Sequence, residues 1–386
     1  MARWEGIEQP IKSDGRVAAV PGGRAEAYVP TPYAVNHAAA LLELANGDLL
    51  LVWFAGMTEE GRRDISIVMS RLNAGSDRWT QPEKISRDEE KSEQNPLLFQ
   101  APDGKLLLLH TAQKAAEMSR REFERLYPGQ VFTRQETAEI RCLVSEDNGM
   151  TWGPSRTMFG KPGSFCRAPI AVLENGDWIF PMWYSLSDGR TSYGSDYSVV
   201  QISNDKGEAW TEYPIPGSKG RVHASIVELG GGSLIALFRS RSADNIYISR
   251  SADYGRTWTE PTRTALPNNN ASIRAIRLAS GRIAVIYNHQ RANDDPDLTV
   301  WPRERAPITL AISEDGGLTW PYARNLDLGD GFIGEANSRF NRRYHYPWIV
   351  QTKDGLIHAA YTYAGGAGIK HVVLSEDWIL GTALQS

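Results

Sequence analysis

The side chains that could carry out nucleophilic or acid–base chemistry recur at one matched position in six similar segments. Each segment holds two apolar runs joined by a turn glycine. The residues nine positions before those glycines are Ala38, Asn95, Arg167, His223, Ser272 and Tyr346. His37 and His345 stand one position earlier in their segments. Tyrosine and histidine can act as nucleophile or base, and arginine binds anionic groups, so the set predicts a polar site.

Further polar side chains follow the second apolar run of several segments. Arg239 and Arg241 follow one run, and His289 follows another. If a fold brings these ends to the starts of the first runs, the groups surround one mouth of a channel. The candidate substrate-binding residues are Arg167, Arg239, Arg241, Asn95, His289 and Asp64, and the candidate catalytic residues are Tyr346, His223, His37, Glu59 and Glu60. The alternative is that the channel residues hydrogen-bond to one another and only seal it.

The two glutamates lie in an acidic loop at residues 58–64, after the first segment. A carboxyl group near arginines and an apolar wall can have its pKa shifted for general acid catalysis, which makes Glu59 or Glu60 the candidate acid. Asp64 begins the next strand, where it would contact substrate or pair with a neighbouring arginine. A solvated loop without a catalytic role is the alternative.

The spacing of runs and turns predicts the fold that must position these groups. Asn-Gly and Asp-Gly between β-type runs are hairpin signals, and the turn glycines are Gly47, Gly104, Gly176, Gly232, Gly281 and Gly355. A third run and a short fourth run follow each pair. Six such units predict an all-β protein, a six-bladed β-propeller of four-stranded antiparallel blades over residues 36–386. Residues 1–35 are a lead-in, of which residues 25–29 would close the last blade.

A repeated phrase and three long links complete this pattern. The phrase is SEDNGMTW at residues 145–152, SADYGRTW at 251–258 and SEDGGLTW at 313–320, with a weaker copy at 203–210. Its aspartate can bind the N–H groups of its own turn, which predicts a structural role away from the axis. The links at residues 112–139, 288–307 and 329–344 leave on the face of the candidate site, and the first contains a predicted helix over 115–126.

Composition argues against several classes of protein. A formal net charge of −4 without a basic patch argues against nucleic acid as a partner. Cys142 and Cys166 define neither a disulfide framework nor a zinc site, and no nucleotide-binding or zinc-peptidase motif occurs, so we expect no cofactor and no metal. No stretch is apolar enough for a signal core or a membrane span, which predicts a cytoplasmic protein without a membrane partner. A secreted protein whose signal had been removed would look the same.

The repeated phrases resemble the Asp-box, or bacterial neuraminidase (BNR) repeat, of the sialidase superfamily. The resemblance extends from about residue 36 to residue 380, and the segments 36–56, 94–106, 266–289 and 346–363 look like its predicted-neuraminidase branch. Sialidases use a tyrosine nucleophile, a glutamate that activates it, an aspartate acid/base and three arginines that bind the sugar carboxylate. The resemblance implies the same fold and a carbohydrate substrate.

Carried over position by position, the resemblance is partial. Tyr346 matches the nucleophile, Glu59 or Glu60 matches the acid/base, and Arg239 or Arg241 matches one arginine. His37 stands where the family has its first arginine, and His223 stands where it has the activating glutamate. This branch therefore lacks part of the arginine triad, and for the third arginine there are only loop candidates, which are Arg291, Arg303 and Arg305.

Three functions fit this pattern. The first is a glycoside hydrolase, exo-acting and sialidase-like, on an anionic sugar of the sialic acid or uronate type. The second is a polysaccharide lyase on the same propeller that cleaves a uronate linkage, with histidine or tyrosine as base. The third is a carbohydrate-binding propeller without catalysis.

Overall fold

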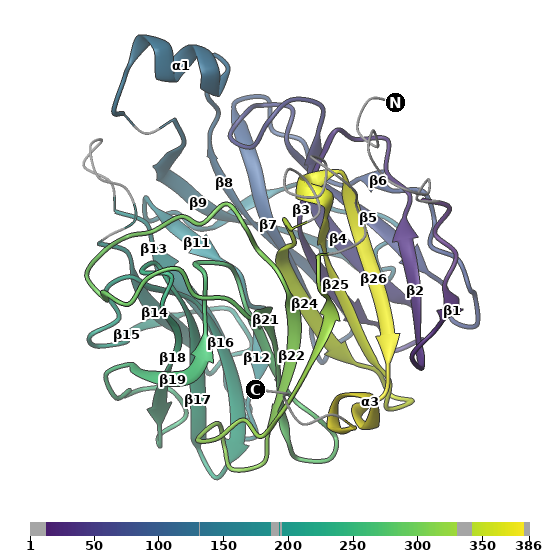
Figure 1. Ribbon diagram of the computed structural model, residues 1–386. Coiled ribbons are helices and arrows are strands. Elements are labelled where there is room, and N and C mark those ends of the chain that lie inside the picture. The colour runs from purple at the N-terminus through teal and green to yellow at the C-terminus, as the bar shows by residue number, and fades with distance from the viewer. Residues whose placement is uncertain (1–12, 131, 187–192, 194, 330–341, 382–386) are drawn as a thin grey trace.

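The chain forms six antiparallel sheets arranged around one axis, as Figure 1 shows. The computed structural model describes residues 13–130, 132–186, 193, 195–329 and 342–381. The first strands of neighbouring sheets contact one another and therefore lie nearest the axis. The core lies between the sheets, where side chains such as Trp53, Leu108 and Ile235 are fully buried. The predicted six-bladed β-propeller is confirmed.

Blades 1 to 3 come from the first half of the chain. Blade 1 contains β3 (Val35–Glu43), β4 (Leu49–Gly56), β5 (Ser66–Leu72) and β6 (Glu83–Lys84). Blade 2 contains β7 (Lys91–Gln100), β8 (Leu106–Lys114), β9 (Arg134–Ser145) and β10 (Arg156–Phe159). Blade 3 contains β11 (Ser164–Cys166) and β12 (Ala171–Val172), which both pair with β13 (Trp178–Tyr184), and then β14 (Tyr197–Ser203) and β15 (Thr211–Pro214). Its inner strand is therefore interrupted between residues 166 and 171.

Blades 4 to 6 follow in the same order. Blade 4 contains β16 (Arg221–Gly230), β17 (Ser233–Ser240), β18 (Asn245–Ser251) and β19 (Thr262–Pro267). Blade 5 contains β20 (Arg274–Arg277), β21 (Ile283–Asn288), β22 (Ile308–Ser313) and β23 (Tyr322–Asp327). Blade 6 contains β24 (His345–Gln351), β25 (Ile357–Tyr363) and β26 (Gly368–Leu374), then β2 (Arg24–Val29) and β1 (Ala18–Val20). A 3-10 turn, η3 (Ala364–Gly366), and the short helix α3 (Glu376–Leu380) flank β26.

The two ends of the chain meet in blade 6. Strand β2 pairs with β26, so a segment of the lead-in supplies an outer strand to the last blade. The buried ammonium group of Lys370 lies 2.9 Å from the carboxylate of Glu26 and 3.0 Å from that of Asp327. These ion pairs connect β26, which contains Lys370, with β2 near the start of the chain and with the outer strand of blade 5, β23.

The Asp-box phrases lie in the turns between the third and fourth strands. In the turn after β18, Asp253 accepts hydrogen bonds from the hydroxyl of Ser251 at 2.8 Å and from the N–H of Thr257 at 2.8 Å. Trp258 is buried at the same turn. Because strands alternate in direction, these turns lie on the face opposite the starts of the inner strands. The aspartates stabilise blade ends and are remote from the axial mouth.

Four inner strands contain a β-bulge at the position found by counting back from the turn glycine. Ala38, Asn95, His223 and Tyr346 have φ angles of 60°, 50°, 54° and 49°. The strand register shifts at each of them. A bulge bends its strand and changes the direction of a side chain. The same position is bulged in four blades, and in three of them the residue, Asn95, His223 or Tyr346, lies at the axial mouth.

The first long link contains a helix that is shorter than predicted. Helix α1 (Arg120–Leu126) begins at Arg120, where Ser119 caps it by accepting from the N–H of Glu122 at 3.2 Å. The preceding residues are not helical because the N–H groups of Ala115 and Ala116 donate to the carbonyls of Glu90 and Gly61. Figure 1 shows α1 projecting above the propeller, on the side opposite α3.

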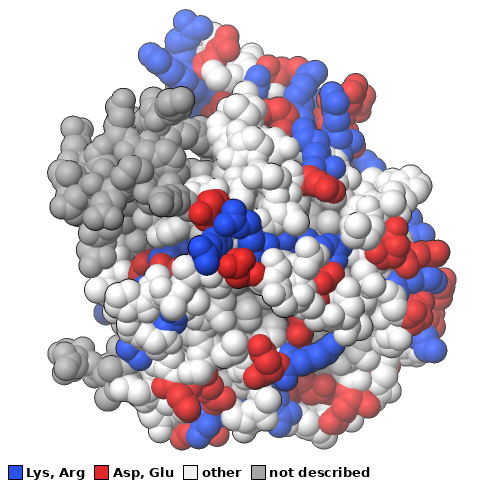
Figure 2. Space-filling view, turned by 90° about the vertical axis from the view of Figure 1, so that its right-hand side faces the viewer, with Lys and Arg blue, Asp and Glu red and all other residues white. Residues whose placement is uncertain are grey.

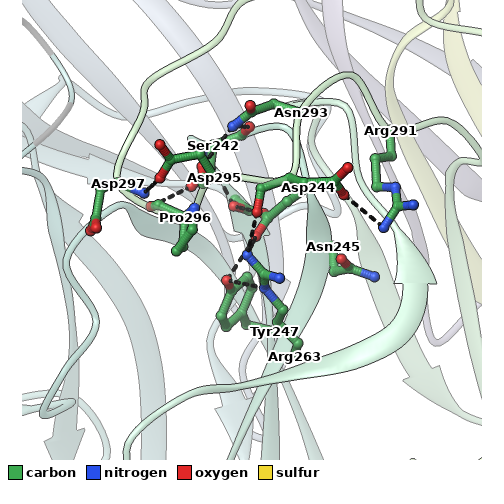
Figure 3. A network of polar contacts seen from close by, with 12 residues as sticks. Ser242, Asp244, Asn245, Tyr247, Arg263, Arg291, Asn293, Asp295, Pro296 and Asp297 are labelled. Atoms are coloured by element: carbon green, nitrogen blue, oxygen red, sulfur yellow. Dashed lines mark hydrogen bonds and ion pairs between the residues drawn. The ribbon is translucent and has the colours of Figure 1, made fainter.

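The link between β21 and β22, residues 289–307, crosses from blade 5 to blade 4, and we call it the strap. Figure 3 shows its Asn293 and Pro296 beside Ser242 of blade 4. The amide of Asn293 donates to the Ser242 carbonyl at 3.1 Å, and the Ser242 hydroxyl donates to the Pro296 carbonyl at 2.8 Å. Below them, buried Asp244 accepts from Tyr247 and pairs with Arg263. The strap is thereby fixed over the axial mouth.

The third long link, at residues 329–344, falls mostly outside the described residues.

On the face drawn in Figure 2, acidic and basic side chains are interspersed. No helix among the described residues is long and apolar enough to cross a membrane.

A buried acid in blade 2 links stability to pH. Glu93 is 2% exposed, and its carboxylate accepts from the hydroxyl of Ser86 at 2.8 Å. Burial raises the pKa of Glu93 to about 7. The folded protein therefore holds this proton more tightly than the unfolded chain does, and stability is lost as pH rises toward that pKa.

Replacing Glu93 removes this loss. We expect Glu93→Gln to gain unfolding free energy relative to the wild type as pH rises from about 4.5 to about 7.5. The total change is up to about 3 kcal/mol, from ~1.4 kcal/mol per unit of pKa shift. Urea unfolding at several pH values measures it, with the exposed Glu90→Gln as control. A stability difference that is independent of pH would contradict the argument.

Candidate active site

A cavity of about 290 Å³ opens where the inner strands begin. Inner strands, second strands and the long links all contribute to its wall. The lining residues are His37, Glu60, Gln94, Asn95, Arg120, Thr133, Gln135, Phe165, Trp183, Tyr193, His223, Arg241, Trp301, Arg305, His345 and Tyr346. Within the described part of the chain, no group of three or more acidic, histidine or cysteine side chains could hold a metal ion.

Tyr346 lies among arginines in this cavity. Its hydroxyl accepts a hydrogen bond from Nη1 of Arg239 at 2.9 Å, and the Arg305 guanidinium lies 5.9 Å from its ring centre. Burial alone would raise the pKa of Tyr346, but Arg239 and Arg305 outweigh burial and lower that pKa below its ordinary value. The environment therefore favours the phenolate form, which is the form that acts as nucleophile or base.

His223 shares the same arginine. Its Nε2 lies 3.2 Å from Nη1 of Arg239, and its Nδ1 lies 3.0 Å from the hydroxyl of Ser272. Because arginine can only donate, Nε2 must accept, which assigns the proton to Nδ1 and makes the ring neutral. Burial, and then Arg239, lower the pKa of His223 well below its ordinary value. The indole of Trp183 stacks on the ring at 4.3 Å.

Two further histidines border Tyr346. The ring of His37 lies 4.3 Å from that of Tyr346 and 5.1 Å from that of His345. Nδ1 of His37 lies 3.1 Å from the hydroxyl of Thr362. Burial, followed by the charge of Arg305, lowers the pKa of both histidines well below the ordinary value. All three histidines of the cavity are thus neutral near pH 7.

The structure separates the two candidate acids of the first loop. Glu60 lines the cavity, and burial raises its pKa although Arg120, Arg305 and Arg239 act in the opposite direction. Glu59 is not among the cavity residues, and its carboxylate accepts from the N–H of Arg120 at 2.7 Å, at the start of α1. Only Glu60 is placed where it could exchange a proton with a ligand.

Three other candidates lie outside the cavity lining. Asp64 accepts from the N–H groups of Met57 and Thr58 at 2.7 and 2.9 Å and from the Thr58 hydroxyl, so it closes its own loop. His289 lies behind the wall, with Nδ1 2.6 Å from the hydroxyl of Tyr287. Arg167 is 2% exposed and donates to backbone carbonyls on the axis.

Asn95 and Arg241 line the cavity, and Arg239 contacts it through Tyr346. Arg241 is paired with buried Asp196, whose Oδ2 lies 2.6 Å from Nη2. Arg239 donates through Nε to Asn270 at 2.8 Å, a neutral partner, and its Nη2 has no partner among the described residues. The charge of Arg239 is therefore not balanced by a neighbouring carboxylate in the described structure.

The cavity also contains residues that the sequence did not single out. Gln94, Trp183, Arg120 and Trp301 belong to this group, while Arg305 was only one of three loop candidates. Trp301 is 45% exposed, and the Arg239 and Arg241 guanidinium groups lie 5.3 and 5.2 Å from its ring. Gln94 directly precedes Asn95, just as His37 precedes Ala38 and His345 precedes Tyr346. The same position that singled out the two histidines could therefore have indicated Gln94. The links carry no periodicity that indicates which of their residues face inward.

The strap explains why Arg305 reaches the cavity. The side-chain amides of Asn270 and Asn288 donate to the carbonyls of Val300 and Arg305 at 2.7 Å each. The backbone of Arg305 also pairs with the residues that lead into β24. Its guanidinium forms no hydrogen bond or ion pair with any described residue, and the residue lines the cavity.

The comparisons agree with this architecture. The sequence model of the BNR repeat-like domain family matches residues 47–359, so the chain belongs to that family, within the sialidase-like superfamily of propellers. A sialidase of Bacteroides fragilis (strain YCH46) is 24% identical over 220 residues, covering 50% of this chain and 36% of that protein. A sialidase of Clostridium perfringens is 26% identical over 144 residues, covering 33% and 35%. The matches span about a third of these curated relatives.

Solved structures are similar in fold. The Hadza microbial sialidase Hz136 superposes with a TM-score of 0.69 at 17% identity, over 90% of this chain and 67% of that one. A protein of unknown function from Dyadobacter fermentans DSM 18053 gives a TM-score of 0.69 at 20% identity, over 92% and 99%. At these identities the similarity shows the fold alone.

The environment of Tyr346 can be measured without a substrate. We expect the ultraviolet titration of the wild type to contain one tyrosine that ionises below the ordinary value of about 10, and Tyr346→Phe to remove it. Arg305→Met should raise its pKa, because a cation near the phenolate is lost. The exposed strap variant Arg303→Met is the control. Identical titration curves for the wild type and Tyr346→Phe would contradict the assignment.

Proposed function

We propose that this protein is an exo-acting glycoside hydrolase for an anionic sugar. The observation that supports the proposal is Tyr346 held between Arg239 and Arg305, in a cavity where Glu60 is the one acid among the described lining residues. The guanidinium of Arg305, which pairs with no described carboxylate, would bind the carboxylate of the sugar, and a bidentate contact of this kind is strong and specific. Membership in the sialidase-like superfamily supports the same class of substrate.

The cavity residues account for both halves of a retaining reaction. The Tyr346 oxygen attacks the anomeric carbon while the glycosidic C–O bond breaks, and Glu60 gives its proton to the departing oxygen. Water then attacks the tyrosyl glycoside and transfers a proton to Glu60, and Tyr346 leaves as the phenolate. The raised pKa of Glu60 keeps its proton available, and the lowered pKa of Tyr346 makes its oxygen the better nucleophile.

A polysaccharide lyase is the second candidate. The neutral rings of His37 and His345 and the lowered pKa of Tyr346 favour it, since each could remove a proton next to a uronate carboxylate that an arginine neutralises. A lyase product carries a new carbon–carbon double bond with ultraviolet absorbance, and a hydrolase product does not. Cleavage without that absorbance excludes the lyase. If no acidic glycan is cleaved, the remaining hypothesis is a carbohydrate-binding propeller without catalysis.

Substitution of the acid provides the sharper test of hydrolysis. Glu60→Gln should lower kcat/KM, which reports the first step, by about 10²- to 10⁴-fold on a substrate with a poor alkyl leaving group, because general acid catalysis is lost. It should lower kcat/KM much less on an aryl glycoside whose leaving group needs no proton. Steady-state kinetics on both substrates measure the two losses of kcat/KM.

The neighbouring Glu59→Gln is the matched control, because its side chain caps α1 outside the cavity. It should leave both rates near those of the wild type. Tyr346→Phe should abolish turnover of both substrates. Equal losses of kcat/KM on the two substrates in Glu60→Gln would reject Glu60 as the acid.

A further inference from the structure

Arg167 connects three blades at the axis, beneath the cavity. It lies in the gap between β11 and β12 of blade 3, so the alternation of side chains along a strand does not fix the direction of its side chain. Its Nη2 donates to the carbonyl of Ala39 at 2.8 Å and to that of Tyr346 at 3.0 Å. Its Nη1 donates to the carbonyl of Ala38 at 3.4 Å. One guanidinium group thus binds the inner strands of blades 1 and 6.

The carbonyls that Arg167 binds belong to two of the bulges. Ala38 and Tyr346 have φ angles of 60° and 49°. A left-handed backbone is unfavourable for a non-glycine residue and persists only where the surroundings hold it. A bulge also leaves backbone groups without partners in the ladder, and Arg167 supplies donors to them. The Tyr346 bulge is therefore held from below by Arg167 and from the side by Arg239.

We infer that Arg167 is a positioning residue for Tyr346: by binding the backbone of the Tyr346 bulge, it holds the phenol oxygen against Arg239. Arg167 does not line the cavity and so does not contact a ligand. Its effect on any reaction passes through the direction of the Tyr346 side chain. The inference rests on the proposed function only where turnover is measured.

Arg274 of blade 5 offers a matched comparison. The guanidinium groups of Arg167 and Arg274 lie 4.9 and 4.7 Å from the ring of Trp348. Arg167 is buried and Arg274 is half-buried. Arg274 donates to the hydroxyl of Ser225 at 3.3 Å, and it makes no contact with Tyr346 among the described residues. Arg274→Met therefore removes an arginine from the same tryptophan ring without releasing the Tyr346 backbone.

The first test is the ultraviolet titration of tyrosine, which needs no substrate. Arg167→Met should move the Tyr346 ionisation, identified by its loss in Tyr346→Phe, to higher pH, because the released hydroxyl can leave Arg239. Arg274→Met should leave it in place. The inference is overturned if Arg167→Met titrates like the wild type, or if Arg274→Met shifts the ionisation equally.

Arg167→Lys covers the case in which Arg167→Met does not fold. Lysine keeps the positive charge but lacks the planar fork that spans both strands. We expect a smaller shift in the same direction. A wild-type titration in Arg167→Lys would show that charge alone matters and would refute a positioning role.

The second test uses turnover of an anionic aryl glycoside. Arg167→Met should lower kcat on the order of tenfold to a hundredfold with KM close to the wild-type value, because misplacement of a reacting group affects the chemical step. Arg274→Met should retain the wild-type kcat. A larger effect on KM than on kcat would assign Arg167 to binding instead. If the wild type turns over no substrate, the proposed function fails, while the titration still decides the role of Arg167.

Discussion

One guanidinium group, that of Arg239, sets the protonation of two aromatic side chains at once. Its Nη1 lies 2.9 Å from the hydroxyl of Tyr346 and 3.2 Å from Nε2 of His223. Since arginine only donates, both partners must accept, which fixes His223 as neutral and favours ionised Tyr346. The bulges that direct His223 and Tyr346, the amide of Asn270 that orients Arg239 and the strap above it all serve to hold this contact.

Among the described residues, the cavity carries more positive charge than neighbouring carboxylates neutralise. Asp196 balances Arg241, but Asn270 is a neutral partner for Arg239, and Arg305 has no partner among the described residues. Glu60, the one acid that lines the cavity among the described residues, has a pKa that burial raises. Burial of an unpaired charge is costly, so a bound anion would lower the free energy of a site of this charge as well as satisfy its donors. The charges of the described residues therefore support the proposed anionic ligand.

The sequence predicted the propeller because its signals are local and repeated. Counting from the turn glycines also found the bulge residues, since four of the six blades keep the same number of residues between the hairpin turn and the bulge. Counting residues from the turn glycine could not show that the inner strand of blade 3 is interrupted. Arg167 lies in this interruption, and its side chain lies beneath the cavity instead of lining it. Nor could the count separate Glu59 from Glu60, or select Arg305 among three strap arginines. Those assignments depend on contacts between blades 1 and 2 or blades 4 and 5, for which one sequence carries no periodic signal.

The position of His223 has a chemical consequence. In the sialidase pattern that the sequence resembles, a glutamate stands there and takes the proton of the tyrosine. A neutral histidine that already accepts from Arg239 cannot do this, because its one lone pair is occupied. The charges of Arg239 and Arg305 instead lower the pKa of Tyr346 and so favour its phenolate without a local base. A phenolate can attack carbon or remove a proton, so under the proposed function the reaction would depend on which ligand atom Arg305 and Glu60 place against it.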